Sequence, residues 1–390
     1  MSAHPSSAIL HAGAPDKNMT VFRKVRVAVH DPVAFIGFES GETLLIVRDV
    51  ELERVRTRGD ADEVRVYEEF EPEGGLSGDR EIRAAQAVTE CLRRRGVVEV
   101  TADRTLPLLY VETLRDANIR VQLDPHLGVA DRRRKTADER EALREAQEIT
   151  ESAVRMACEL IAGADTDDAG VLIDRRPGHD GRVLTSEVVK SAIISFLAEQ
   201  GAVTEDPCVS GGPAGADCHW SGSGPLRSGE PVIVDIFPRH AATGFHGDCT
   251  RVVVHGDVSE DVAQMHAALI EAKAAGIAAL RAGVTGEDVH LATVEVIQRH
   301  GFHTGWPPEH APDSYATMTH GTGHGIGLDL KELPLLDLKG PELVEGDCVT
   351  VEPGLYRPDT GGLRIEDMLI VTDDGAENLN RLHEGLSWRV

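Results

Sequence analysis

Four acidic residues lie in apolar, β-rich parts of this 390-residue chain, where an isolated charge would be costly. Asp235 and Asp248 lie in one pair of β-rich segments, and Glu352 and Glu366 lie in a second pair. Burying a carboxylate without a partner is strongly unfavourable. Divalent cations remove that cost, because oxygen ligands and metal charge compensate each other. The four residues therefore predict a divalent-metal site, with a purely structural ion pair to Arg364 as the alternative for Glu366.

A glycine-rich run at 320–328, HGTGHGIGL, carries two more candidate residues. Glycine lets a backbone approach a site closely and adopt unusual angles. His320 and His324 have the spacing of the zincin pair, but the glycines around them disfavour the helix that this pair requires. A hydrogen-bonded structural histidine is the alternative for each. In a chain that also supplies four carboxylates, the two histidines predict a metal ligand and a proton-transfer group.

The segments that position these residues repeat along the chain. Helices are predicted over 185–201 and 285–301, and Thr, Glu, Val and the closing Gly recur in both at an offset of 100. A longer helix precedes each one, over 136–162 and 259–282, and a pair of β-segments follows each one. Such self-similarity predicts two related halves around a pseudo-two-fold axis, with a site where the halves meet.

The first third of the chain has a different pattern. Strand-like and helix-like segments alternate there, which predicts an α/β domain with its own core. A linker-like stretch at 124–135 follows, and Thr136 and Glu139 then have the spacing of a helix capping box. We therefore expect two domains, 1–135 and 136–390.

Composition argues against several other functions. The formal net charge is -26, so no nucleic acid and no anionic membrane surface is expected as a partner. The six cysteines are spread along the chain without a CxxC pair, which is typical of reduced thiols in a cytoplasmic protein. Residues 1–17 show no secretory signal, and no apolar run has the length of a membrane span.

Together the motifs resemble the pita-bread metallopeptidases, a family that includes methionine aminopeptidase, prolidase and aminopeptidase P, with creatinase as a metal-free relative. The resemblance rests on VIVDIF, DCTR, HGTGHGIGLDL, VEPGLY and GLRIED, and it covers roughly residues 136–371. It implies an α+β pita-bread domain with an internal pseudo-two-fold repeat, preceded by a creatinase-like α/β domain. A homodimer is compatible with the same resemblance.

The resemblance also implies a set of metal ligands. They are Asp235, Asp248, His324, Glu352 and Glu366. Asp248 and Glu366 would bridge two divalent metal ions, and Asp235 would chelate one of them. His324 and Glu352 would complete the other. Manganese suits this oxygen-rich set with its single imidazole, as do cobalt, iron(II) and zinc.

Four further residues match positions on the substrate side of the family's site. His320 matches a histidine that steadies the tetrahedral intermediate, and His219 matches a further active-site histidine, with an ordinary loop histidine as the alternative. Arg364 matches an arginine near the proline or carboxylate end of the substrate. Lys331 stands where prolyl-specific members carry a second histidine. Lysine can donate a hydrogen bond there, but near pH 7 it is no neutral acid-base relay unless its pKa falls far.

These assignments predict an aminopeptidase that hydrolyses the N-terminal peptide bond of its peptide substrate, with proline preferred as the second residue. A hydroxide that bridges the two metal ions would attack the peptide carbonyl, and Glu352 would move the proton. Three alternatives stay open. They are a prolidase acting on Xaa-Pro dipeptides, a metal-free creatinase-like enzyme or binding protein, and a dinuclear phosphoesterase.

Overall fold

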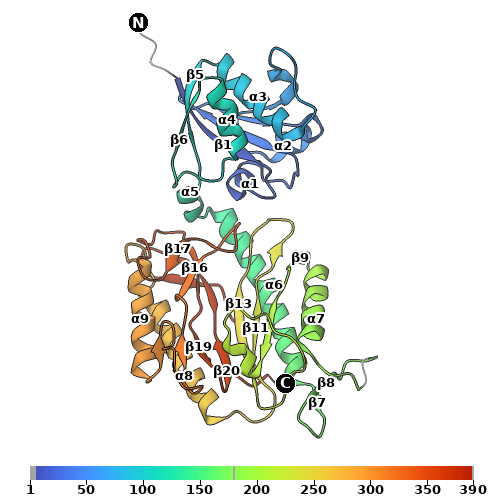
Figure 1. The fold of residues 1–390 in the computed structure, drawn as a ribbon, viewed down its shortest axis with the longest axis vertical. Helices are drawn as coiled ribbons and strands as arrows, with labels where there is room; N and C mark the ends of the chain where they lie inside the picture. The colour runs from blue at the N-terminus through green and yellow to red at the C-terminus, as the bar shows by residue number, and fades with distance from the viewer. Residues whose placement is uncertain (1–5, 179–180, 389–390) are drawn as a thin grey trace. The chain divides into compact units, whose positions relative to one another are not determined.

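The computed structural model describes residues 6–178 and 181–388 of the chain (Figure 1). The chain divides into two compact units, Met1–Arg132 and Arg133–Val390, and the division falls within the short helix α5, Val129–Arg133. Within the two described ranges, no helix combines the length and the apolar composition needed to cross a membrane.

The N-terminal unit is built on a six-stranded sheet with the order β4-β3-β2-β1-β5-β6. β1 pairs antiparallel with β2 and parallel with β5, so the sheet is mixed. Leu92 of α3 and Leu114 of α4 are fully buried in the core formed with the sheet. This arrangement confirms the predicted α/β N-terminal domain. The elements are β1 Ser6–Gly13, α1 Met19–Val25, β2 Val33–Phe38, β3 Thr43–Val47, η1 Asp49–Glu51, α2 Leu52–Arg58, β4 Glu63–Val66, η2 Tyr67–Phe70, α3 Arg80–Arg94, β5 Val97–Ala102, α4 Leu108–Asp116 and β6 Arg120–Leu123.

The C-terminal unit holds its main strands between two helix pairs, α6 with α7 and α8 with α9 (Figure 1). The predicted helix repeat is confirmed, because Thr185 and Thr285 each cap their helix by accepting a hydrogen bond from a backbone N–H of its first turn. Such caps satisfy donors that the helix itself leaves free. The four helices are α6 Ala137–Ala162, α7 Ser186–Glu199, α8 Glu260–Ala279 and α9 Gly286–Arg299.

Three sheets of the C-terminal unit carry or flank the candidate residues. Their strand orders are β10-β11-β13, β14-β15-β19-β20 and β17-β16-β18-β21-β22. The strands are β10 Cys208–Gly211, β11 Pro231–Ile236, β13 Cys249–Val254, β14 His303–Thr304, β15 Thr317–Met318, β16 Gly323–Gly325, β17 Glu332–Leu336, β18 Cys348–Val351, β19 Gly354–Arg357, β20 Gly361–Arg364, β21 Asp367–Val371 and β22 Ala376–Asn378. The smaller elements are β7 Asp165–Thr166, β8 Leu172–Ile173, β9 Ala202–Val203, η3 Gly212–Ala216 and β12 Arg239–His240.

The second β pair differs from its prediction. The sequence indicated one strand over 363–371, but the structure has two, β20 and β21, in different sheets. Glu366 lies between them, where the chain passes from one sheet to the other. Glu352 likewise follows the end of β18 and Asp248 precedes β13, so of the four acidic residues Asp235 alone lies inside a strand. A strand end is a good position for a ligand, because a side chain there is not restricted to one of the two faces of the sheet.

Candidate metal centre

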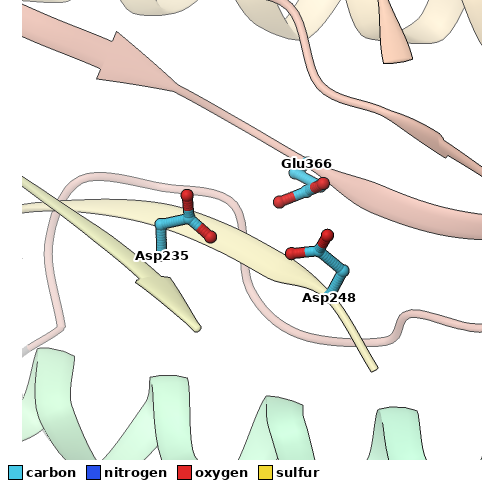
Figure 2. A group of neighbouring side chains, drawn as sticks. All are labelled: Asp235, Asp248 and Glu366. Carbon is cyan, nitrogen blue, oxygen red and sulfur yellow. The ribbon is translucent and has the colours of Figure 1, made fainter. Parts of the chain in front are cut away.

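Three carboxylates from distant parts of the chain form the middle of the site. Oxygen atoms of Asp235, Asp248 and Glu366 all lie within 4.8 Å of one another. Figure 2 shows the three groups turned toward each other from separate segments. Asp248 and Glu366 are buried, and Asp235 is partly buried. Like charges this close repel strongly in a low-dielectric setting, so the cluster requires protons or cations.

His324 and Glu352 extend the cluster on one side. The Nε2 atom of His324 lies 3.4 Å from Oε1 of Glu352 and 3.8 Å from Oδ2 of Asp248. All five residues line one cavity of about 440 Å³, which we call the central cavity. Asp248 therefore lies between Asp235 on one side and His324 on the other.

Burial and mutual repulsion shift the acidity of the cluster. Burial, followed by the charge of Glu366, raises the pKa of Asp248 well above its usual range. Burial, followed by the charge of Glu352, raises the pKa of Glu366 in the same way. Burial would raise the pKa of Glu352 too, but His324 and His320 outweigh it and leave that pKa lowered. A divalent ion bound among these three acids would favour their ionised forms, because its charge offsets their repulsion.

Asp235 supplies a direct test of whether the residues fit a metal. Its Oδ2 atom accepts a hydrogen bond of 2.6 Å from the Arg364 guanidinium. Its Oδ1 atom is buried and has no hydrogen-bond partner among the residues that the structure describes. A buried carboxylate oxygen is seldom left unbonded. Asp235 belongs to the cluster of three carboxylates and keeps this oxygen unbonded, so the donor set fits a hard divalent cation.

Side-chain hydrogen bonds hold the cluster in place. Thr250 Oγ1 donates to Oε2 of Glu366 at 2.7 Å, and Thr350 Oγ1 donates to Oε1 of Glu352 at 3.0 Å. Gly323 lies so close to the backbone of Thr350 that a Cβ atom there would collide with its carbonyl. The sequence analysis missed both threonines. Each is two residues from an acidic candidate along the chain, and that spacing could have indicated them.

Helix α6 contributes a further support that the sequence did not indicate. Gln147 is fully buried, and its Oε1 atom accepts a hydrogen bond of 2.8 Å from the backbone N–H of Asp248. Its Nε2 atom donates to the Asp248 carbonyl at 2.7 Å and to Oδ1 of Asn380 at 2.9 Å. Asn380 Oδ1 also accepts from the backbone N–H of Met368, in β21. The two amides thus link the segments that carry Asp248 and Glu366.

His320 belongs to a hydrogen-bonded group beside the carboxylates. Its Nδ1 atom lies 2.8 Å from the Gly321 carbonyl, and its Nε2 atom lies 2.7 Å from the Tyr356 hydroxyl. Arg364 donates to the same hydroxyl at 2.8 Å. Burial lowers the pKa of His320, which favours the neutral ring. Tyr356 was not among the predicted residues, and the VEPGLY motif that contains it was its only signal.

The remaining predicted residues line the same cavity. His219 is exposed, and its backbone N–H donates a hydrogen bond to Oδ1 of Asp217. Lys331 is also exposed, and within the described part of the chain it has no hydrogen bond or ion pair. The structure therefore brings all nine predicted site residues to one cavity, and their individual roles stay predictions.

Comparisons with known proteins agree with this arrangement. Residues 141–373 match the model of metallopeptidase family M24. The probable dipeptidase PepE of Mycobacterium tuberculosis is 35% identical over 224 residues, which cover 54% of this chain and 55% of the relative. The Xaa-Pro dipeptidase of Pyrococcus furiosus is 28% identical over 162 residues, 41% of this chain and 42% of the relative. The chain thus spans about half the length of the curated relatives it matches.

Similarity to solved structures extends over nearly the whole chain. An Xaa-Pro dipeptidase from Bacillus anthracis superposes with a TM-score of 0.78 at 22% identity, covering 98% of this chain and 94% of that one. The pita-bread C-terminal fold and the preceding α/β domain are thereby confirmed. Because the family model matches more than half of the residues, this chain belongs to metallopeptidase family M24.

Proposed function

We propose that this chain is a dinuclear metallopeptidase that hydrolyses the N-terminal peptide bond of short peptides, as an Xaa-Pro aminopeptidase does. The observation that carries the proposal is the convergence of Asp235, Asp248 and Glu366 within 4.8 Å, with His324 and Glu352 beside them. Asp248 and Glu366 are the proposed bridging ligands. The position of Asp248 between Asp235 and His324 supports a bridge, because it lies close to donors of both proposed ions.

A pair of divalent cations, when bound, acidifies water and polarises the peptide carbonyl. The remaining chemistry belongs to the chain. Glu352 is the proposed proton acceptor, since its lowered pKa keeps it ionised and Thr350 fixes one of its oxygens. His320 is the proposed donor to charge that develops on the carbonyl oxygen or the leaving amine. Since its Nδ1 proton faces the Gly321 carbonyl, this donation requires a second proton, on Nε2. Tyr356 and Arg364 orient the His320 ring through its Nε2 side.

The choice of metal is proposed from the donor set. Four carboxylates and one imidazole are mostly hard oxygen ligands, which manganese prefers and which cobalt, iron(II) and zinc also accept. We propose manganese. Metal analysis after purification without chelators tests this, and fewer than two bound ions per chain under saturating metal would contradict the dinuclear centre.

A dipeptidase is the second candidate, and Lys331 favours it. This exposed ammonium lines the central cavity and has no partner within the described ranges, so it is free to bind the C-terminal carboxylate of a dipeptide. The names of the relatives from Mycobacterium tuberculosis and Pyrococcus furiosus point the same way. In this case Lys331→Met raises KM for the free acid of a dipeptide and leaves KM for its amide unchanged.

The deciding experiment is a peptide panel with the metal-reconstituted protein. It compares Ala-Pro, Ala-Pro-Ala and Ala-Ala-Ala by release of the first residue. Our proposal expects cleavage of Ala-Pro-Ala, with the proline peptide preferred. Cleavage of Ala-Pro alone would replace the aminopeptidase by the dipeptidase, and cleavage of Ala-Ala-Ala alone would remove the proline preference. No cleavage of any peptide would refute the peptidase.

A further inference from the structure

A second cavity of about 500 Å³ lies in the C-terminal unit, next to the central cavity. Its wall includes the aromatic rings of Trp306, Tyr315 and Tyr356, together with prolines of the loop 305–316 and Pro358. We call it the aromatic chamber. Trp306 is 86% exposed. Together with the prolines and tyrosines beside it, this ring forms an exposed apolar patch, and such patches mark interaction sites.

The aromatic chamber adjoins the site already described. Cys218 lines both cavities. Its carbonyl accepts a hydrogen bond of 3.4 Å from Arg364, and its sulfur lies 3.7 Å from the Thr319 hydroxyl. Tyr356 lines the chamber, while its hydroxyl is bonded to His320 and Arg364 of the metal centre. The chamber therefore adjoins the central cavity at Cys218, so a peptide bound in the central cavity lies close to it.

Contacts within the chain hold the loop that forms the chamber. Gly305 at the start of its loop donates to the Met318 carbonyl at 2.8 Å, and the Thr317 hydroxyl donates to the Gly305 carbonyl at 2.8 Å. Tyr315 stacks on His303 with ring centroids 4.0 Å apart and planes 2° apart. The loop is thus tied at its base and at Tyr315. Preformed apolar cavities of this size are typical of ligand sites.

We propose that the aromatic chamber binds the part of a longer peptide that follows the cleaved bond, and that it favours an extended, proline-containing segment. This inference rests on the proposed function. Aromatic surfaces recognise proline-rich peptides because the extended proline helix is preformed and loses little entropy on binding. Asp217 and Glu309 are the charged residues of the chamber wall within the described chain, and no cationic side chain lies in that wall. A free C-terminal carboxylate inside the chamber would therefore be repelled.

The first test compares peptide lengths. The substrates are Ala-Pro, the tetrapeptide Ala-Pro-Pro-Ala as its amide, and the same tetrapeptide as its free acid. In the parent protein we expect the amide to be cleaved with a higher kcat/KM than the free acid. Trp306→Ala should lower the ratio of kcat/KM for the tetrapeptide amide to that for Ala-Pro about tenfold, because it removes a large aromatic contact surface. Leu291→Ala, which truncates an exposed leucine on α9, is the matched control and should leave that ratio unchanged.

The second test needs no catalysis and separates this inference from the proposed function. The metal-free protein is titrated with the tetrapeptide amide while tryptophan emission is recorded. Binding in the chamber should shift the emission of exposed Trp306 to the blue, and Trp306→Ala should abolish the shift although Trp220 and Trp388 remain. A shift that persists in Trp306→Ala, or no shift at all, overturns the chamber. If the shift occurs and the metal-loaded protein cleaves none of the peptides, the proposed peptidase activity is refuted and peptide binding in the chamber is supported.

A second copy of this chain is the competing occupant. Sedimentation of the parent and Trp306→Ala proteins at several concentrations decides the matter. Loss of a dimer in Trp306→Ala, together with an unchanged ratio of tetrapeptide to dipeptide cleavage, would assign Trp306 to a subunit interface and overturn the proposal. An unchanged state of assembly with a reduced ratio supports it.

Discussion

The substitution Gln147→Met tests whether helix α6 holds the proposed bridging ligand Asp248. Methionine is unbranched, similar in length and a good helix former, so α6 itself should be unaffected. The substitution removes an amide that is fully buried and makes three hydrogen bonds, at 2.7, 2.8 and 2.9 Å. Two of them are to the backbone N–H and carbonyl of Asp248.

The magnitude follows from which groups lose their partners. Asn380 Oδ1 keeps the hydrogen bond from the Met368 N–H. The Asp248 N–H and carbonyl have no other hydrogen-bond partner within the described chain. Each buried group left unsatisfied costs about 1–3 kcal/mol, so the two together should lower the free energy of unfolding by about 2–6 kcal/mol. Since Asp248 loses its orientation, metal affinity should fall about 10–100-fold.

Two measurements check this prediction. Urea unfolding of the metal-free protein gives the change in the free energy of unfolding, and calorimetric titration with manganese gives the change in affinity. Gln264→Met, on the exposed face of α8, makes the same chemical change where its amide bonds only Glu260 at 3.1 Å. That control should alter the free energy of unfolding by less than about 0.5 kcal/mol.

Two results would refute the reasoning. If Gln147→Met is as stable as the Gln264→Met control, the amide does not support the Asp248 backbone. If it is destabilised but binds manganese with the parent's affinity, the hydrogen bonds stabilise the fold without positioning a ligand.

Three further predictions concern a proton acceptor, a buried ion pair and a histidine. Glu352→Gln should abolish turnover under saturating metal, because an amide cannot accept the proton; the peptide panel measures this. Lys273→Met should lower the free energy of unfolding by about 3 kcal/mol in urea, because it removes a buried cation paired with Asp367 at 2.5 Å. Burial lowers the pKa of His246 from 6.5 to about 4. As pH falls below 6.5 the unfolded state gains a proton that the folded state does not, so stability declines. His246→Gln should remove about 2 kcal/mol of the loss between about pH 7 and 4.5.

Each of these predictions has a contrary outcome. Near-normal turnover of Glu352→Gln would remove Glu352 as the proton carrier. A loss of less than about 1 kcal/mol for Lys273→Met would show that Arg251 and Asn378, which also bond Asp367, are enough to satisfy that carboxylate. Parallel pH profiles for His246→Gln and the parent, measured by urea unfolding without metal, would assign the acid sensitivity to other groups.

Local sequence determined much of this protein. Thr185 and Thr285 begin their helices at matched places, because a hydroxyl that satisfies a free N–H acts over a few residues and can be read from spacing. Gly323 is required by the close approach of the Thr350 backbone and Gly325 by that of Leu333, and the density of glycines here is visible without a structure. The candidate ligand types were likewise identifiable, since carboxylates among Val and Ile are costly without a counter-charge.

Tertiary structure decided what those local signals could not. Gln147 supports Asp248 across 101 residues of sequence, and Asn380 extends the link toward Glu366. The residues adjacent to Gln147 and Asn380 in the sequence do not indicate these contacts. The sequence indicated one strand around Glu366, but the chain passes there from one sheet to another. That passage depends on which strands pair. The aromatic chamber likewise exists only where the loop 305–316 meets Cys218 and Tyr356. Such features arise from contacts between distant segments, and their partners are selected by packing of the whole unit, which no local pattern of residues encodes.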